Sequence, residues 1–443
     1  AALAQSIAAT ARSTRSCLLI AAAALCFSTL PAAVSFADPV SSLSDVADDP
    51  ANAFVSHEER LSKPEAVFSR SPLARLREAK AEFDKALYDA ARVRLTFAYT
   101  QLVQGIASAP DLDDTIGTAS DFDAFISWDV LNPGAPNAGK FLLHFEGRYD
   151  WGTTSPQALG FEAGSLVNPA NAFARYDPVF LPIRNFFWEQ GSPAAGWGYR
   201  VGYISPDAIY FTSPHLNPNT TFQTIAGTGN FASGVPDSGF GIAGSYWIND
   251  DVRIVAGVHD ANADRQDWGD IGEGDFFYAA EIGARLFPRT ADGGLSKFTL
   301  WNSDGTSDGS ASNASTGLSG WGYYVQHDQE LTDDGNIVAL LKYGKSFDDS
   351  GTYDQQAGVS LLFYDQTDFI GVKNDVIGIS YNWIEPTSLI PGAREEHNIE
   401  VFARVPLFPA VDLTLGYQTI INPSVDPDND VAHVFGLRLR TTF

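Results

Sequence analysis

The chain has 443 residues, with 28 lysines and arginines against 54 aspartates and glutamates, so its formal net charge is −26. This excess of acid argues against nucleic-acid binding, which needs basic patches to displace counterions from phosphates. Apolar residues make up 44% of the chain and charged ones 19%, which argues against general disorder. The 39 glycines, 30 phenylalanines, 16 tyrosines and 9 tryptophans favour a large β protein over a helical enzyme.

Residues 1–37 have the pattern of an export signal. Arg12 and Arg15 precede the apolar run 17–27, and small residues follow it. Charged, apolar and small-residue regions in this order are typical of a signal peptide, and the run is too short to span a bilayer. We therefore expect Sec-type export with cleavage at the end of this segment. Both cysteines of the chain lie inside it, so we expect no disulfide and no thiolate metal site in the mature protein.

Residues 38–90 are predicted to form a periplasmic segment with one amphipathic helix. The first part is acidic and polar. Between residues 64 and 90, apolar side chains recur at intervals of three, four and seven, at Leu73, Leu76, Phe83 and Leu87. The role of this helix does not follow from the pattern.

From residue 91 to the end, the hydrophobic period changes to two. Apolar residues alternate with small, polar or charged ones, as a strand with two unlike faces requires. Sixteen strands are predicted, at 91–105, 119–131, 140–150, 181–190, 196–204, 238–248, 251–259, 274–287, 294–302, 317–329, 336–346, 354–364, 373–384, 396–404, 410–421 and 432–443.

The connections between these strands favour a membrane barrel over a soluble sandwich. Tight links, as at 249–250 and 407–410, alternate with longer segments rich in Gly, Asp, Ser, Asn and Pro. An even strand number with short and long connections in alternation is typical of outer-membrane barrels, whose polar face lines the lumen. We therefore predict an all-β fold, a transmembrane antiparallel 16-stranded β-barrel over 91–443. The long, polar span 205–237 could fold into its pore.

The C-terminal strand supports this interpretation. Phe435, Leu437, Leu439 and the terminal Phe443 share one face, while Arg438 points the other way. Outer-membrane barrels end on such a strand with an aromatic residue, and through Phe443 we expect contact with the barrel-assembly machinery. Outward aromatic residues are expected at the membrane interfaces, namely Tyr99, Trp128, Tyr381, Trp383 and Tyr417.

Strand parity selects candidate pore-lining residues. Opposed arginines and carboxylates in a porin lumen set a field and bind solute hydroxyls, although any one arginine could simply pair with an acid on a neighbouring strand. The candidates are Arg94, Glu146, Arg148, Trp188, Arg200, Arg253, Glu281, Arg285, Glu400, Arg404, Arg438 and Arg440. The parity around Trp188 is ambiguous, so this ring could also face lipid.

Enzyme motifs occur only in unsuitable contexts. Gly239–Gly244 fits G-x-G-x-x-G but lies within a strand and leads to an Asn-Asp turn, where a dinucleotide site needs a helix. Gly305–Gly309 fits G-x-S-x-G but lies in a polar loop without a strand-to-helix elbow. We predict no catalytic residue, cofactor or metal.

Three stretches resemble the carbohydrate-selective porins of the OprB family. They are FWEQGSPAAGWGYRVGYISPDAIYFT at 187–212, PDSGFGIAGSYWINDDVRIVAGVHDA at 236–260, and the C-terminal 397–443. The resemblance covers about 90–443 but is loose over 91–180. It implies a sixteen-stranded outer-membrane channel for passive uptake of sugars.

We therefore expect an outer-membrane porin for mono- or disaccharides in a Gram-negative bacterium. The sugar preference rests on the resemblance alone, and a general or anion-preferring porin is the main alternative. An outer-membrane enzyme or adhesin and a secreted β protein such as a lectin are the other possibilities. Expected partners are small sugars, outer-membrane lipid and lipopolysaccharide, with a homo-oligomer possible.

Overall fold

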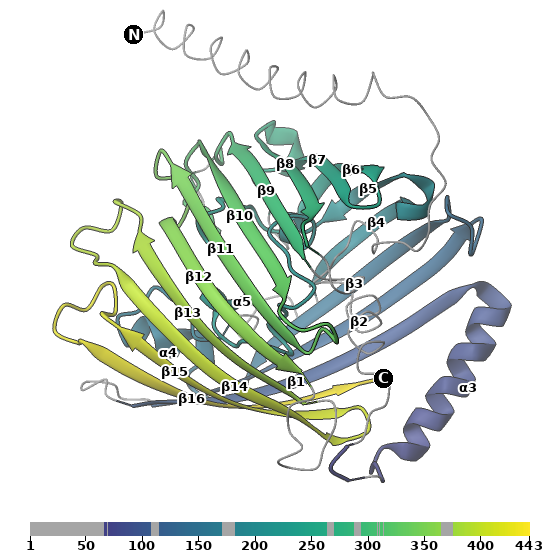
Figure 1. The fold of residues 1–443 in the computed structure, drawn as a ribbon, viewed down its shortest axis with the longest axis horizontal. Coiled ribbons are helices and arrows are strands. Elements are labelled where there is room, and N and C mark those ends of the chain that lie inside the picture. Colours follow the sequence, from purple (N-terminus) through teal and green to yellow (C-terminus); the bar gives the residue numbers. More distant parts are fainter. Residues whose placement is uncertain are drawn as a thin grey trace, which may run out of the picture. The chain divides into compact units, whose positions relative to one another are not determined.

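Sixteen antiparallel strands close into one barrel (Figure 1). Every strand pairs with its neighbours in the chain, and β1 closes the barrel by pairing with β16. The strands are β1 (Val93–Ala107), β2 (Ile116–Leu131), β3 (Gly139–Asp150), β4 (Ile183–Ser192), β5 (Trp197–Ile204), β6 (Gly239–Asn249), β7 (Val252–Asp260), β8 (Phe276–Arg285), β9 (Leu295–Ser303), β10 (Gly320–Glu330), β11 (Ile337–Phe347), β12 (Tyr353–Tyr364), β13 (Val376–Pro386), β14 (Glu396–Phe408), β15 (Val411–Ile421) and β16 (Val431–Thr442).

The structure is a computed structural model that describes most of the chain from residue 66 onward. The described residues are 66–68, 70–107, 115–170, 182–263, 270–287, 294–307, 309, 311–312, 314–364 and 375–443. The predicted signal at 1–37 lies outside them. All of the described residues belong to one compact unit, Val40–Phe443.

The predicted strand pattern is confirmed. Each of the sixteen strands overlaps the segment that the alternation of apolar and polar residues predicts. The connections also alternate in length, with two exceptions. The connection 365–375 is long although it lies at the end of the barrel that carries the short turns. The link at 348–352 is short although it lies at the end of the barrel that carries the long loops, which include 205–238. We refer to this end as the loop end, and to the end where β1 begins and β16 finishes as the turn end.

The two faces of the wall differ as a membrane barrel requires. Apolar side chains such as Ile242, Ile282 and Leu415 are exposed on the outer face. Aromatic residues lie there too, and of the expected interfacial set Trp128, Tyr381 and Tyr417 are exposed. The inner face carries polar and charged groups that are buried, because two chain segments fill much of the lumen.

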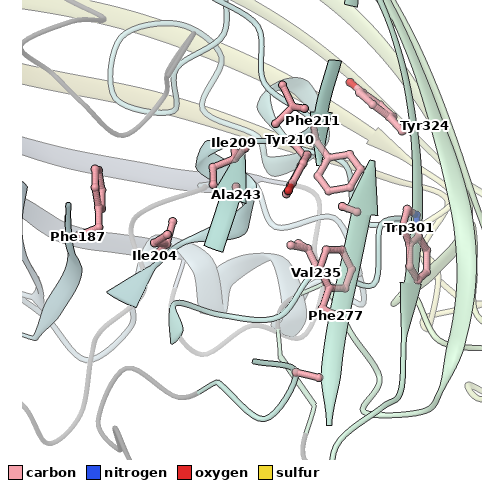
Figure 2. Packing of buried hydrophobic residues seen from close by; sticks show 14 of the residues in the cluster. Phe187, Ile204, Ile209, Tyr210, Phe211, Val235, Ala243, Phe277, Trp301 and Tyr324 are labelled. Carbon is pink, nitrogen blue, oxygen red and sulfur yellow. The ribbon is translucent and has the colours of Figure 1, made fainter. Parts of the chain in front are cut away.

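The larger of these segments is the connection 205–238, which we call the inserted loop. It contains η2 (Pro206–Ala208) and α5 (Ile225–Thr228), and most of its residues are buried. Tyr210, Phe211 and Val235 pack among strand residues such as Phe277 and Trp301, as Figure 2 shows. The expectation that this span folds inward is therefore confirmed.

The second segment, 151–170, follows β3 and contains α4 (Pro156–Glu162). Ser155 caps this helix by accepting a hydrogen bond from the Ala158 N–H at 3.2 Å. The two inward segments touch each other, since the Ile225 N–H donates to the Asn168 carbonyl at 2.9 Å. The lumen is thus filled by two mutually supporting pieces of chain.

The predicted N-terminal helix is α3 (Ala74–Ala91), which leads directly into β1. It ends at Arg92, which has a left-handed backbone with φ 60°. The helix lies beside the turn end of the barrel (Figure 1). Within the part of the chain that the structure describes, no helix is long and apolar enough to cross a membrane.

Candidate functional site

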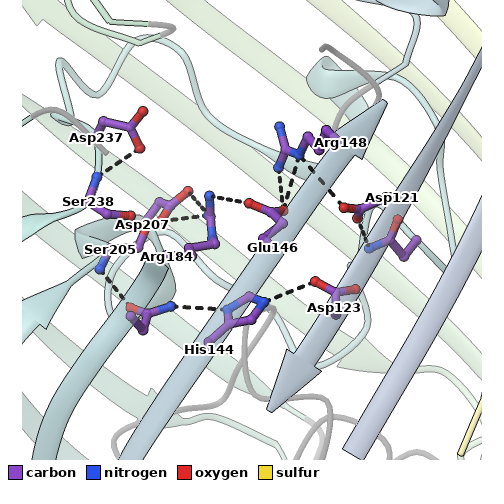
Figure 3. A network of polar contacts seen from close by, with 12 residues as sticks. Asp121, Asp123, His144, Glu146, Arg148, Arg184, Ser205, Asp207, Asp237 and Ser238 are labelled. Carbon is purple, nitrogen blue, oxygen red and sulfur yellow. Dashed lines mark hydrogen bonds and ion pairs between the residues drawn. The ribbon is translucent and has the colours of Figure 1, made fainter. Parts of the chain in front are cut away.

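A row of charged side chains crosses the lumen face of β2, β3 and β4 (Figure 3). It starts on β2 with Asp121 and Asp123, two residues apart and therefore on the same face of the strand. On β3, which pairs with β2, His144 contacts Asp123 through Nε2 and Oδ1 at 3.0 Å. We call this surface, with the residues of the next paragraph, the charged wall.

Acids and bases alternate along the charged wall. Arg148 Nη2 donates to Glu146 Oε1 at 2.6 Å, and Arg184 Nη1 of β4 lies 3.4 Å from the other oxygen of the same carboxylate. Arg184 also pairs with Asp207 of the inserted loop at 3.3 Å. Arg440 of β16 reaches Asp123 at 3.9 Å. Each carboxylate therefore has a guanidinium beside it, which compensates for removing both charges from water.

The inserted loop supplies most of the opposite lining. Together with the charged wall it encloses a cavity with about 1210 Å³ of empty space, including the part open to solvent. The loop contributes apolar side chains such as Phe211 and Leu216, and hydroxyls and amides at Thr212, Ser213, Asn217, Asn219, Asn230 and Ser233. It touches the charged wall where Asn219 Nδ2 donates to Asp121 Oδ2 at 2.9 Å.

The remaining acid of the lining is Asp237, near the end of the inserted loop. Burial raises the pKa of this carboxyl to about 7, although the positive charge of Arg184 opposes the shift. Its Oδ1 accepts a hydrogen bond from the Ser238 N–H at 2.8 Å. The charge of the lining therefore depends on pH near neutrality.

Buried charges of β14 and β16 hold the inserted loop in place. Glu400 accepts hydrogen bonds from the backbone N–H groups of Gln223 at 2.7 Å and Thr224 at 2.9 Å. Arg438 donates to the carbonyls of Pro218 and Thr221, both at 2.8 Å. Glu400 and Arg438 are both fully buried. They satisfy backbone groups that would otherwise be buried without partners.

A second anchor lies further round the same side of the barrel, on β11 and β12. Lys342 Nζ donates to the carbonyls of Ala226 at 2.5 Å and Gly229 at 3.1 Å. Gln356 Nε2 donates to the same two carbonyls, and its Oε1 accepts from the Phe231 N–H at 3.0 Å. Lys342 and Gln356 thereby fix the C-terminal end of α5 by donating hydrogen bonds to carbonyls that the helix itself leaves without partners.

Inward-facing glycines give the loop room. Gly416 and Gly436 face each other across β15 and β16, and a Cβ on either would run into the amide of Gln223. That amide accepts a hydrogen bond from Gln104 Nε2 at 2.9 Å. The tip of the Gln223 side chain therefore occupies the space that a Cβ at either glycine would need.

The structure divides the sequence-predicted pore residues into groups. Glu146, Arg148 and Arg440 line the cavity, whereas Glu400 and Arg438 anchor the inserted loop. A third group forms buried ion pairs between neighbouring strands on the lumen face. Arg200 pairs with Glu189 at 2.5 Å, and Arg253 pairs with Glu281 at 3.4 Å.

Three further candidates lie on the lumen side but away from the cavity lining. Arg404 is buried on β14. Arg94 and Arg285 lie near the turn end, where Arg94 pairs with Asp129 at 2.8 Å. Parity therefore places all eleven charged candidates on the inner face, but only part of them at the cavity.

Trp188 corrects the candidate set. It lies on the outer face, where its ring meets that of Phe141 edge-on at 4.9 Å and its Nε1 donates to Tyr199 Oη at 3.1 Å. Its neighbour Phe187 is the buried, inward residue. A register shift between His144 and Phe145 changes the pairing of β3 with β4, so simple alternation through this strand is interrupted.

Half of the charged wall is missing from the pore-lining candidates that strand parity selects. The missing residues are Asp121, Asp123, His144 and Arg184. The alternation of residues on β2 could have identified the two aspartates as inward-facing. They share one face of the strand with Ala119 and Phe125. Arg184 has no such signal, since Arg184 and Asn185 are both buried beside the register shift.

Asp121, Asp123 and Glu146 bring carboxylate oxygens within 4.8 Å of one another, a spacing that a cation could bridge. Arg148 lies 3.9 Å from Asp121 and Arg440 lies 3.9 Å from Asp123. Guanidinium groups therefore already supply positive charge at this cluster.

A closed antiparallel barrel with an apolar outer face and a polar, loop-constricted lumen defines a porin of the Gram-negative outer membrane. The sequence matches the family described as "Carbohydrate-selective porin, OprB family" over residues 199–443. The chain belongs to this family, whose members are channel proteins. The matched part begins after the three strands of the charged wall.

One solved structure supports the fold, and two others are less similar. The high-pH structure of Pseudomonas putida OprB is 16% identical, with a TM-score of 0.66 over 82% of this chain and 97% of that one. The low-pH structure of the same protein is 12% identical, with a TM-score of 0.49 over 86% and 100%. A mutant of Rh. blastica porin is 11% identical, with a TM-score of 0.47 over 79% and 100%. No curated protein matches the sequence.

Proposed function

We propose that the protein lets small neutral carbohydrates, mono- or disaccharides, diffuse through the cavity between the charged wall and the inserted loop. The observation that carries this proposal is the distribution of charge in the lining. Three arginines and four carboxylates contribute to it, together with neutral amides and hydroxyls. Such a surface offers many hydrogen-bond donors and acceptors with little net charge.

The placement of these charges favours neutral solutes over ions. Guanidinium and carboxylate groups alternate along one wall at 2.6 to 3.9 Å, so their fields largely cancel a short distance into the cavity. An ion-selective pore needs an unbalanced ring of one sign or opposed rows of charge. The opposite lining adds amides and hydroxyls, which suit sugar hydroxyls, together with apolar side chains.

Rings and paired charges can share the recognition of a sugar. Phe125, Phe211 and Phe231 contribute to the lining and offer apolar surface to the C–H face of a pyranose. Glu146 and Arg148 offer an acceptor and donors side by side to neighbouring hydroxyls. Binding must remain weak for the solute to leave.

The general or anion-preferring porin remains the competing function, and planar-bilayer recording separates the two. We expect stable conductance steps that glucose blocks and a small carboxylate such as acetate does not, with a reversal potential near zero in a KCl gradient. Block by acetate with strong anion selectivity would favour the competitor. Steps indifferent to both solutes would remove the sugar preference, and no steps from folded protein would refute the channel.

A matched pair of variants connects the block to the cavity. Glu146→Gln removes a lining carboxylate, so glucose block should weaken several-fold. Glu281→Gln removes an equally buried glutamate that pairs with Arg253 away from the lining, and block should persist. Equal effects of the two variants would contradict the proposed site.

The orientation and partners follow from the barrel pattern. We infer that the turn end faces the periplasm, because signal-directed export at 1–37 leaves both ends of the barrel there. Contact of the C-terminal strand and Phe443 with the assembly machinery, lipopolysaccharide around the outer face, and a homo-oligomer complete this proposal. Protease accessibility of α3 in intact and permeabilised cells tests the orientation.

A further inference from the structure

The helix α3 carries an apolar stripe that the barrel does not cover. Leu76 and Phe83 are 54% and 53% exposed, and none of the residues of this helix is buried. The alanines Ala79, Ala86 and Ala90 lie on the same flank, because residues three, four and seven apart share one side of a helix. We call this set the α3 stripe.

The opposite flank of the helix is polar and exposed. Glu78, Glu82, Lys85 and Asp89 lie there in contact with solvent, and Lys85 and Asp89 pair along the helix at 2.6 Å. The helix is therefore amphipathic without having its apolar side packed on protein in the part of the chain that the structure describes. Two large exposed hydrophobic groups on one flank are unusual for a helix surrounded by water.

Contacts of α3 with the barrel fix the direction of the stripe. Tyr88 Oη donates to Asp129 Oδ2 at 3.1 Å, and Arg94 lies over the Tyr88 ring at 4.2 Å. Asp129 and Arg94 belong by parity to the lumen face of β2 and β1. Tyr88 therefore marks the side of the helix turned toward the lumen.

Lys80 marks the next side of the helix. Its ammonium group donates to the Leu95 carbonyl at 2.8 Å and lies 5.7 Å from the centre of the Phe97 ring. Phe97 has the opposite parity to the buried Ala98 and stacks on Phe122, so it belongs to the outer wall.

At about 100° of rotation per residue, the order around the helix axis is Tyr88, Lys80, then Leu76 and Phe83. The first faces the lumen and the second faces the outer wall. The α3 stripe comes next in the same direction around the helix axis. It therefore points away from the lumen, on the outer side of the barrel wall. This is the side on which the barrel meets lipid.

The outer wall beside the helix has the features of a membrane interface. Trp128 is 47% exposed and lies in register with Val93, the first residue of β1 after α3. It stacks on Phe141, which contacts Trp188, so an aromatic cluster runs along the turn end of β2 to β4. Such aromatic clusters mark the level of the lipid headgroups.

We propose that α3 is an interfacial helix whose stripe inserts Leu76 and Phe83 into the phospholipid leaflet at the turn end of the barrel. The occupant is phospholipid, because the stripe is turned to the same side as the apolar outer wall and lies beside its aromatic cluster. The polar flank, with four acidic and basic side chains, then remains in water, as in other amphipathic helices that lie in the plane of an interface.

Site-directed fluorescence in liposomes tests this proposal. The full chain carries Cys17→Ser and Cys26→Ser, with one new cysteine labelled by NBD at Leu76→Cys or Phe83→Cys. Glu78→Cys and Glu82→Cys are matched controls on the polar flank of the same turns. The bilayer is phosphatidylethanolamine and phosphatidylglycerol, with or without doxyl-labelled phospholipid.

We expect doxyl lipid to quench the stripe labels at least twofold more than the control labels, and aqueous iodide to do the reverse. Equal quenching by iodide at all four positions would place the stripe in water and refute the proposal. Protection from iodide without quenching by doxyl lipid would show that protein covers the stripe, either a second copy or residues 1–65, and would also refute it. Heat-modifiable migration on a gel verifies that each variant barrel is folded.

Discussion

Removing the side chain of Arg438 tests whether the inserted loop sets the pore. Arg438 is fully buried and donates to two loop carbonyls at 2.8 Å, those of Pro218 and Thr221. A hydrogen bond from a charged donor contributes about 1.5–3 kcal/mol, so Arg438→Ala removes roughly 3–6 kcal/mol of loop docking. Each 1.4 kcal/mol is a factor of ten in an equilibrium.

The loop keeps other anchors in this variant, at Glu400, Lys342 and Gln356. We therefore expect the part around residues 217–224 to leave the wall for a measurable fraction of time. Single-channel recording should show higher mean conductance, flickering between two open levels, and weaker glucose block. Arg438→Lys should be intermediate, because an ammonium group cannot reach both carbonyls in the forked geometry of a guanidinium.

Arg200→Ala is the matched control. Arg200 is also a buried arginine of the lumen face, but its hydrogen bond goes to Glu189 of the neighbouring strand and its guanidinium stacks on Phe187. Its loss should lower the thermal stability of the barrel and leave the conductance steps quiet. Unchanged conductance, noise and block in Arg438→Ala, with the barrel folded, would refute the assignment of this arginine as a loop anchor.

Three further variants have distinct outcomes. Asp237→Asn should abolish a rise in cation preference between pH 5.5 and 8.5, because the carboxyl with pKa about 7 gains its charge in this interval; a persistent rise in reversal potential would contradict this. Gly436→Val should push Gln223 off the wall and give the flickering expected for Arg438→Ala; quiet wild-type steps would contradict the close approach. Trp188→Ala should leave conductance and glucose block unchanged and cost about 1–3 kcal/mol in stability through lost outer-wall packing, measured by heat modifiability; altered block would return the ring to the lumen.

The fold was predictable because the alternation of apolar and polar residues is a strictly local property. Each strand must present one face to lipid, so sixteen segments with period two, such as that of β8, identify themselves in the sequence. The same rule placed charged residues such as Glu146, Arg253 and Arg404 on the inner face. It failed at Trp188, because a register shift at the start of the same strand, beside Arg184, leaves the parity of the strand ambiguous in the sequence.

The role of each inward charge was not predictable in this way. Parity states which face a side chain occupies, but not which partner reaches it from another part of the chain. Glu400 and Arg438 contact loop residues about 180 to 220 positions away. Whether such a residue lines the cavity or holds the loop depends on long-range packing, and the sequence pattern of β14 and β16 is the same in both cases.

The division between loop anchors and charged wall also separates two parts of the sequence. Glu400, Arg438 and the inserted loop lie within residues 199–443, which match the family. The part of the charged wall on β2 to β4 lies before residue 199, whereas Asp207 and Arg440 lie after it. Holding a loop inside the barrel needs particular partners for its backbone groups, so changes at the anchors disturb the shape of the pore. Glu146 and Arg148 pair within the wall, so changes there alter mainly which hydroxyls and charges line the cavity, whereas Asp121 and Arg184 also contact the inserted loop. We therefore expect exchange of Glu146 or Arg148 at constant anchors to change the solute preference of the cavity and to keep its constriction.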